Sequence, residues 1–213
     1  MAQVVIKNII FDFGGVFLNV DYAKTRQAFI DAGVVNFDDF YQQSHISPLF
    51  TQLEKGLIEP SVFYSSLRRQ ANTQLTDEQI ETAWDAMLGT FRESSVKFLQ
   101  QLQDKYKLYL LSNANAIHYE AFMQTYKDQF GKNDFESMFE GAYFSHLVHL
   151  QKPHADSYNY ILEKHKLDAS ETLFVDDTFK NIEGAKAVGL QTLFLENGDY
   201  VEDKIGKFID LKA

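Results

Sequence analysis

Apolar residues fall into two patterns along the chain: short continuous runs, and longer segments with apolar positions at helical spacing. The first run, Ile6 to Phe11, is rich in β-branched residues and predicts a buried strand. Similar runs predict further strands at residues 108–111, 142–145, 172–175 and 191–195. Helical spacing predicts helices at residues 94–102, 117–130, 155–164 and 179–188. This alternation predicts an α/β fold, a Rossmann-like doubly wound parallel sheet with helices on both faces.

The region from residue 22 to about residue 90 is helical in character and contains no convincing strand. Helices are predicted at residues 24–32, 37–43 and 49–55, from Pro60 onward, and after the capping-box sequence that begins at Thr76. We therefore expect an α/β core, residues 1–16 and 92–213, interrupted just after its first strand by an all-helical insertion, residues 17–91.

Composition limits the classes of partner. The 213 residues carry a net charge of −10, which argues against nucleic acid or an anionic membrane surface as the main partner. The absence of cysteine excludes disulfides, thiol catalysis and a thiolate metal site. No apolar run approaches membrane-spanning length and the amino terminus is too short for a signal peptide, so we expect a cytoplasmic protein. No heptad pattern is present, which leaves a monomer and a homodimer open.

Polar residues follow three of the predicted strands. Asp12 ends the first strand, Ser112 ends the second, and Asp176 and Asp177 end the fourth. Ligands bind at the carboxyl ends of strands in open α/β sheets, and Lys152 also lies close to this edge. Clustered carboxylates repel one another, so a cation is expected among them, and oxygen ligands favour Mg²⁺ together with a substrate phosphate.

Asp12 is the candidate nucleophile because a carboxylate can attack phosphorus and form an aspartyl-phosphate. The metal ion and Lys152 would offset the charge of the phosphate. Gly14 and Gly15 break the first strand and would let a ligand approach the backbone. Each feature also has a plain structural explanation, since Asp12 can cap its loop and an Asp-Asp pair after a strand can be an ordinary turn.

Four motifs together are similar to those of the haloacid dehalogenase-type superfamily of hydrolases, and the similarity extends over nearly the whole chain. In chain order they are IIFDFGGV, LLSNAN, QKP and FVDDTFKNIEGAKAVG. The insertion at residues 17–91 resembles the helical cap that the family places between its first two motifs. Within the family, the sequences GGVFLNVDY, LEKGLI, SNAN and VDDTFKNIEGA most resemble bacterial sugar-phosphate phosphatases of the α-glucose-1-phosphatase type.

The resemblance implies a role for each matching residue. Asp12 would be the nucleophile, and Ser112 and Lys152 would bind the transferring phosphoryl group. Substrate phosphate would also contact Asn113 and the Gly14-Gly15 turn. Mg²⁺ would be held by Asp12, the Gly14 carbonyl and Asp177, with Asp176 acting directly or through water, while Asn181 would support the site. The implied substrate is a small phosphorylated metabolite, such as a sugar phosphate.

Gly14 departs from the family pattern, because phosphatases of the superfamily usually have a second Asp two residues after the nucleophile. That Asp protonates the leaving group, a contribution of roughly 10² to 10⁴ in rate. An anomeric phosphate such as glucose 1-phosphate would suffer least from its absence, since its leaving oxygen is less basic. Water, a cap residue or Asp21 could replace the missing acid.

Several other side chains have two possible interpretations. Glu54 is either a ligand for a substrate hydroxyl or an exposed helix residue, and Tyr41 and Phe50 belong either to the core or to a pocket. Asn115 is predicted to cap the helix that follows it. His149 occupies a loop position where relatives often have glycine, and an exposed loop histidine is the simplest interpretation.

The leading functional hypothesis is a Mg²⁺-dependent phosphatase. A binding or regulatory protein on a catalytically impaired scaffold is the alternative from another class, motivated by Gly14. A phosphotransferase or mutase reaction would be difficult without an acid–base group beside Asp12. A dehalogenase needs no metal, so the Asp176-Asp177 pair argues against it.

Overall fold

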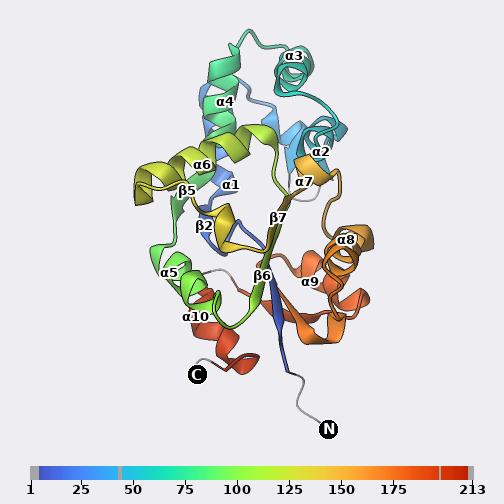
Figure 1. Ribbon diagram of the computed structural model, residues 1–213. Coiled ribbons are helices and arrows are strands. Elements are labelled where there is room, and N and C mark those ends of the chain that lie inside the picture. The colour runs from blue at the N-terminus through green and yellow to red at the C-terminus, as the bar shows by residue number, and fades with distance from the viewer. Residues whose placement is uncertain (1–4, 43–44, 197, 211–213) are drawn as a thin grey trace.

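The computed structural model describes residues 5–42, 45–196 and 198–210. Its centre is a parallel sheet of five strands in the spatial order β7-β6-β1-β8-β9 (Figure 1). Their bounds are β1 Asn8–Phe11, β6 Lys107–Ser112, β7 Gly141–Phe144, β8 Thr172–Asp176 and β9 Gln191–Phe194. The five strands predicted from apolar runs are thus confirmed, and so is the doubly wound α/β fold.

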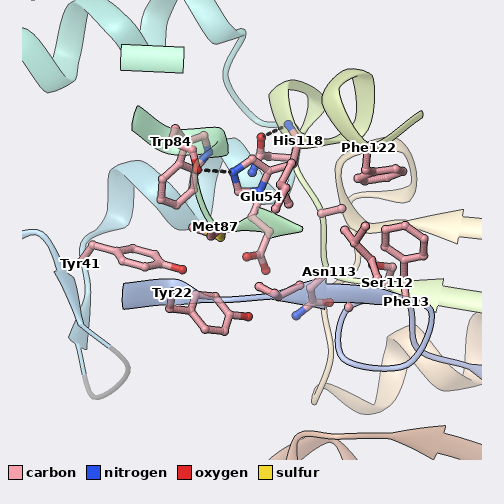
Figure 2. Close-up of a pocket in the computed structure, with 16 residues that line it drawn as sticks. Phe13, Tyr22, Tyr41, Glu54, Trp84, Met87, Ser112, Asn113, His118 and Phe122 are labelled. Carbon is pink, nitrogen blue, oxygen red and sulfur yellow. Dashed lines mark hydrogen bonds between the residues drawn. The ribbon is translucent and has the colours of Figure 1, made fainter. Parts of the chain in front are cut away.

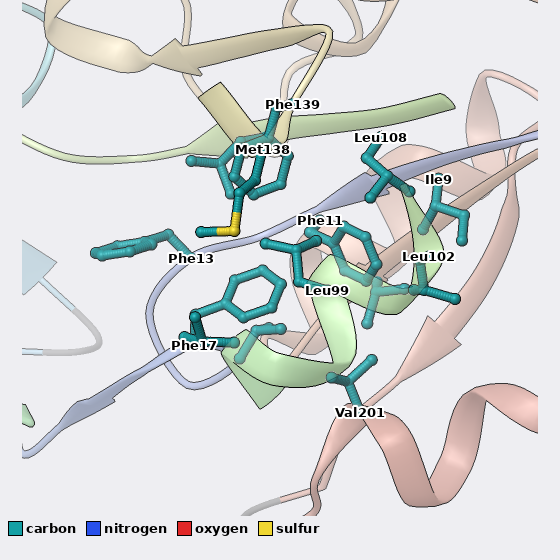
Figure 3. Packing of buried hydrophobic residues seen from close by; sticks show 14 of the residues in the cluster. Ile9, Phe11, Phe13, Phe17, Leu99, Leu102, Leu108, Met138, Phe139 and Val201 are labelled. Atoms are coloured by element: carbon teal, nitrogen blue, oxygen red, sulfur yellow. The ribbon is translucent and has the colours of Figure 1, made fainter. Parts of the chain in front are cut away.

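The central strand β1 is buried on both faces because alternate side chains enter two different cores. Ile9 and Phe11 pack in one cluster with the leucines of α5 (Glu93–Leu102) and with Val201 of α10 (Val201–Lys204) (Figure 3). Side chains of α6 (Ala116–Phe130) belong to the same cluster. Ile10 points the other way and packs among side chains of α8 (Ala155–His165) and α9 (Phe179–Ala187). Helices therefore cover both faces of the sheet.

The order of the strands brings the candidate residues to one edge. The chain runs from β1 outward to β6 and β7, then returns to the other side of β1 to form β8 and β9. The reversal lies between β1 and β8, which pair in register from Asn8 with Thr172 to Phe11 with Val175. Asp12, directly after β1, and Asp176, the last residue of β8, therefore lie side by side at the carboxyl ends of these two strands, where doubly wound sheets bind ligands.

The insertion forms a second packed unit above this edge (Figure 1). Its helices are α1 (Tyr22–Asp31), α2 (Pro48–Glu54), α3 (Pro60–Ala71) and α4 (Asp77–Asp85). They enclose their own aromatic cluster around Phe50, Phe63 and Trp84. The predicted capping box at the start of α4 is present, with Thr76 and Gln79 bonded to each other's backbone. Within the described residues, no helix is long and apolar enough to cross a bilayer.

The prediction that residues 22–90 contain no strand was wrong in detail. An antiparallel ribbon of β2 (Leu18–Val20) and β5 (Leu88–Phe91) connects the insertion to the core. The helix predicted at residues 37–43 is a 3₁₀ turn, Phe37–Asp39, followed by a two-residue hairpin of β3 (Tyr41–Gln42) and β4 (His45–Ile46). Residue 43 itself lies outside the described residues.

The reason for this difference is tertiary packing. Phe37 is fully buried and stacks on Phe29 with ring centroids 4.3 Å apart, and Tyr41 packs edge-on against Trp84 at 5.1 Å. These two contacts direct the rings into the cap interior from a segment too short to form a regular helix. Helical spacing of apolar residues alone does not reveal such contacts.

Candidate active site at the carboxyl edge of the sheet

Lys152 joins two of the candidate carboxylates. Its Nζ lies 2.6 Å from Asp12 Oδ1 and 2.8 Å from Asp176 Oδ2. All three side chains are almost completely shielded from solvent. Asp12 follows β1, Asp176 ends β8, and Lys152 lies in the loop before α8, so three separate segments of the core meet at this ammonium group.

Asp176 is fully engaged by other protein groups. Besides Lys152, its carboxylate accepts hydrogen bonds from the backbone N–H of Thr178 at 2.7 Å and from Asn181 Nδ2 at 3.1 and 3.0 Å. Asn181 lies in the first turn of α9, so the sequence-predicted supporting residue fixes the carboxylate from the helix side. Asp176 is therefore a rigid anchor for Lys152, while Asp12 and Asp177 keep oxygen lone pairs for other partners.

The site has a donor set suited to a hard divalent cation. Asp12, Asp176 and Asp177 each offer one carboxylate oxygen, and these three atoms lie within 4.8 Å of one another. The backbone makes room for this arrangement at Gly15, which has a φ of +73°. A Cβ built there would lie 1.9 Å from Asp177 Oδ2, so a side chain would occupy the place of that carboxylate. The residues present therefore fit Mg²⁺, which prefers carboxylate oxygens.

Electrostatics point to the same conclusion. Three carboxylates and one ammonium group give the cluster a formal charge of −2. Burial, followed by the neighbouring Asp176, raises the pKa of Asp12 above its ordinary value, although Lys152 opposes the rise. Burial opposes the charge of Lys152, but the two carboxylates hold its pKa above its ordinary value. The cluster has more negative charge than its single lysine can offset, and a divalent cation would neutralise the remainder.

Ser112 and Asn113 continue the site beyond the end of β6. Ser112 is buried, and both residues line a small pocket together with Gly14. The side chain of Asn113 exchanges two hydrogen bonds with the backbone of Lys152, donating to its carbonyl and accepting from its N–H, both at 3.0 Å. Asn113 therefore holds the Lys152 loop in place and keeps only one amide hydrogen for a ligand.

Three other residues singled out from the sequence have structural roles. Asn115 caps α6 as predicted, accepting a hydrogen bond from the His118 N–H at 3.0 Å. Asp21 is exposed and caps α1 by accepting from the Ala23 N–H. His149 has a φ of +59°, and one of its ring nitrogens lies 2.8 Å from the carbonyl of Lys55. This histidine therefore contacts the cap.

The pocket lies between the cap and the carboxyl edge of the sheet and has a volume of about 90 Å³. Figure 2 shows the polar ends of Tyr22, Tyr41 and Glu54 directed into the space above Asn113. Apolar walls come from Trp84, Met87 and Phe122, among others. Tyr41 is thus a pocket residue, whereas Phe50 packs inside the cap.

Sequence reasoning did not identify Tyr22, Trp84 or His118 as pocket residues. All three occur in helical patterns typical of core packing, and no local signal distinguishes a pocket-facing aromatic residue from a core residue. Their positions depend on how the cap sits above the sheet, so only the tertiary structure reveals them.

The cap and the core are joined at the end of α2. The Glu54 carboxylate accepts a short hydrogen bond from Gln151, the residue before Lys152. The Glu54 carbonyl accepts another from Ser145 Oγ at 2.7 Å. Gly56 packs so closely that an added Cβ would lie 2.1 Å from the carbonyl oxygen of His146. The end of α2 that carries Glu54 is therefore held firmly against the loop that carries Lys152.

Comparisons with known proteins agree with this architecture. A family model described as haloacid dehalogenase-like hydrolase matches residues 6–189. A D-ribitol-5-phosphate phosphatase of Bacteroides thetaiotaomicron is 33% identical over 198 residues, covering 91% of this chain and 93% of the relative. A crystal structure of a haloacid dehalogenase family enzyme from the same species, in complex with magnesium and inorganic phosphate, has a TM-score of 0.81 at 32% identity, covering 91% of this chain and 96% of that one. A predicted family hydrolase from Porphyromonas gingivalis has a TM-score of 0.85 at 26% identity, covering 95% and 97%.

Proposed function

The chain belongs to the haloacid dehalogenase-like hydrolases, and from that premise we propose that it is a Mg²⁺-dependent phosphomonoesterase acting on a small phosphorylated sugar or polyol. The observation that carries this proposal is the cluster of Asp12, Asp176 and Asp177 around Lys152. The cluster adjoins the pocket through Asn113, which lines the pocket and is hydrogen-bonded to Lys152. The related phosphatase of Bacteroides thetaiotaomicron and the neighbouring magnesium and phosphate complex support it.

In the proposed reaction, Asp12 attacks the phosphorus atom and forms an aspartyl-phosphate, which water then hydrolyses. Lys152 orients the attacking carboxylate through its contact with Oδ1 and offsets phosphate charge. Ser112 and the remaining amide hydrogen of Asn113 would donate to phosphate oxygens. When bound, Mg²⁺ would polarise the phosphoryl group and lower the charge repulsion between phosphate and Asp12. Its direct ligands would be Asp12, Asp177 and the Gly14 carbonyl.

The pocket favours a substrate that carries several hydroxyl groups. Its polar groups include two phenols, the Asn113 amide, the Ser112 hydroxyl and the Glu54 carboxylate, which can bond to hydroxyls from several directions. The related phosphatase acts, by its name, on D-ribitol 5-phosphate, whose phosphate is on a primary carbon rather than an anomeric one. We therefore place primary sugar and polyol phosphates beside glucose 1-phosphate as substrates to test.

A cytoplasmic location and a monomeric or homodimeric state stay predictions from composition. Sedimentation of the purified protein would decide between monomer and dimer.

The proposal is tested by measuring Mg²⁺-dependent phosphate release from p-nitrophenyl phosphate with the unaltered protein and Asp12→Asn. The p-nitrophenolate ion leaves without a proton, so Gly14 cannot mask a working site. We expect turnover that requires both Mg²⁺ and Asp12. Mg²⁺ binding without turnover of this ester or of a panel of sugar phosphates would instead favour a binding or regulatory protein.

A further inference from the structure

Hydrolysis of the phosphate ester of an ordinary sugar or polyol hydroxyl needs a proton donor, because an alkoxide is a poor leaving group. The groups around Asp12 do not offer one. Asp176 is saturated with hydrogen bonds, Asp177 belongs to the cation cluster, and Lys152 is held between two carboxylates. Gly14 lines the pocket but has no side chain, and a Cβ added there would meet Val20 Cγ2 at 3.3 Å.

Glu54 is the carboxyl group that reaches this space from the cap. It lines the same pocket as Gly14 and Ser112, and Figure 2 shows its carboxylate pointing toward Asn113. Among the pocket-lining residues it is the single carboxylic acid. Gln151 donates a hydrogen bond to one carboxylate oxygen, and within the described parts of the chain no other side chain or backbone N–H donates to the second oxygen.

The other titratable groups of the pocket are poorly suited to move a proton in both directions. The ring of His118 donates to the carbonyl of Trp84 at 3.1 Å and stacks on the indole, so it is held away from the pocket centre. Burial raises the pKa of Tyr22 and of Tyr41, which leaves each phenol without an accessible base form. Burial also raises the pKa of Glu54, although Gln151 and Lys152 oppose the rise, and this favours a carboxyl that can carry a proton.

We propose that Glu54, supplied by the cap, is the general acid and base of this active site. The inference rests on the phosphatase function proposed above. As Asp12 bonds to phosphorus, the ester P–O bond breaks and its electron pair passes to the leaving oxygen, which takes the proton of Glu54 and departs as an alcohol. In the second half, the Glu54 carboxylate takes a proton from water as the water oxygen bonds to phosphorus. The bond between phosphorus and Asp12 breaks, its electron pair returns to the carboxylate, and inorganic phosphate is released.

This arrangement would make acid catalysis depend on cap position. Gln151 donates a hydrogen bond to Glu54 and is adjacent in sequence to Lys152, so the proton donor at the end of α2 is anchored to the loop that carries the phosphate-binding lysine. An acid supplied by the cap reaches the leaving oxygen only while the cap is in contact with this loop, and a cap in that position also shields the intermediate from water.

The test compares Glu54→Gln with the unaltered protein on three esters: β-glycerol phosphate, phenyl phosphate and p-nitrophenyl phosphate. Their leaving groups become less basic in that order, so dependence on an acid falls in the same order. We expect kcat/KM for β-glycerol phosphate to fall about 10² to 10⁴-fold more than kcat/KM for p-nitrophenyl phosphate, so that activity depends more steeply on leaving-group basicity. Turnover of the nitrophenyl ester also reports that the variant is folded.

Glu59→Gln is the matched control, because Glu59 is exposed, lies in the loop that follows α2, and makes no side-chain cap bond. It should leave the ratio of the three activities as it is in the unaltered protein. An equal loss on all three esters in Glu54→Gln would overturn the inference and reduce Glu54 to a positioning or substrate-binding residue. If the unaltered protein released phosphate from none of the esters, the proposed function itself would fail, and this inference with it.

Discussion

At the scale of single residues, the arrangement of the candidate active site depends on one lysine and two asparagines. Lys152 lies between two buried carboxylates, and its removal would leave Asp12 and Asp176 facing each other with uncompensated charge. Asn113 and Asn181 each position a group that holds Lys152 beside Asp12: Asn113 bonds to the backbone of Lys152, and Asn181 bonds to the Asp176 carboxylate, which accepts a hydrogen bond from Lys152 Nζ. The side-chain amides of the two asparagines therefore position the charged groups of the site.

Gly15 provides a sharp test of the cation site. A methyl group in Gly15→Ala would occupy the position of the Asp177 carboxylate, and alanine is disfavoured at a φ of +73°. We expect Mg²⁺ affinity to fall at least tenfold, a change of about 1.4 kcal/mol in binding free energy, measured by isothermal titration calorimetry. Gly33→Ala is the matched control, since Gly33 also has a positive φ, of +96°, but an added Cβ there meets no atom of the described structure within 4 Å, so Mg²⁺ affinity should not change. Equal affinities in the two variants would contradict the assignment of Asp177 as a ligand.

At the scale of elements, one helix contact links cap and core beside the pocket. The ring of His118, in the first turn of α6, stacks on Trp84 of α4 with centroids 4.7 Å apart and donates to its carbonyl. Asp85 Oδ1 lies 3.7 Å from His118 Nε2 and is buried without a hydrogen-bond partner. This contact fixes the last turn of α4 over the pocket.

Acidic pH should weaken this contact. Burial lowers the pKa of His118 from 6.5 to about 4 in the folded chain. The unfolded chain therefore binds the proton first, and stability present above pH 6.5 is lost as the pH falls toward 4. Between pH 7 and pH 5 the unaltered protein should lose about 2 kcal/mol more unfolding free energy than His118→Gln, measured by urea denaturation.

The comparison with His118→Gln is necessary because Asp85 titrates in the same range. Burial, followed by Glu81, raises the pKa of Asp85 to about 7, so its contribution to stability changes with pH in the opposite direction. Both proteins carry Asp85, and the difference between them isolates the histidine. Parallel pH curves for the two proteins would show that His118 does not resist protonation.

At the scale of the whole molecule, folding brings three carboxylates, those of Asp12, Asp176 and Asp177, together at one edge of the sheet. A bound cation should therefore stabilise the folded state. A ligand that binds only the native state adds about 2.7 kcal/mol of unfolding free energy at one hundred times its dissociation constant. We expect Mg²⁺ to raise Tm accordingly in differential scanning calorimetry, and Asp177→Asn to remove most of the increase. A Tm shift of equal size in that variant would place the ion elsewhere.

The sequence by itself determined the layered core and the residues at its edge. Short runs of β-branched residues, such as Ile6 to Phe11, predict the core strands correctly, because a central parallel strand is buried on both faces and its sequence is therefore continuously apolar. Asp12 and the Asp176-Asp177 pair could be placed together in advance, since parallel strands end at a common edge. The capping box at Thr76 and the helix cap at Asn115 could also be predicted, because all the residues that form each cap lie within one helical turn of the sequence.

Only the tertiary structure decided how the cap meets that edge. The link between Glu54 and Gln151 spans 97 positions in sequence, and the bonds of Asn113 to Lys152 span 39. The ribbon of β2 and β5 and the turn at Phe37 likewise depend on partners far along the chain. The spacing of apolar residues along the sequence predicts that a side chain is buried, but it does not predict which residues the side chain packs against. Which residues line the pocket therefore depends on how the cap packs against the core, and no local sequence pattern specifies that packing.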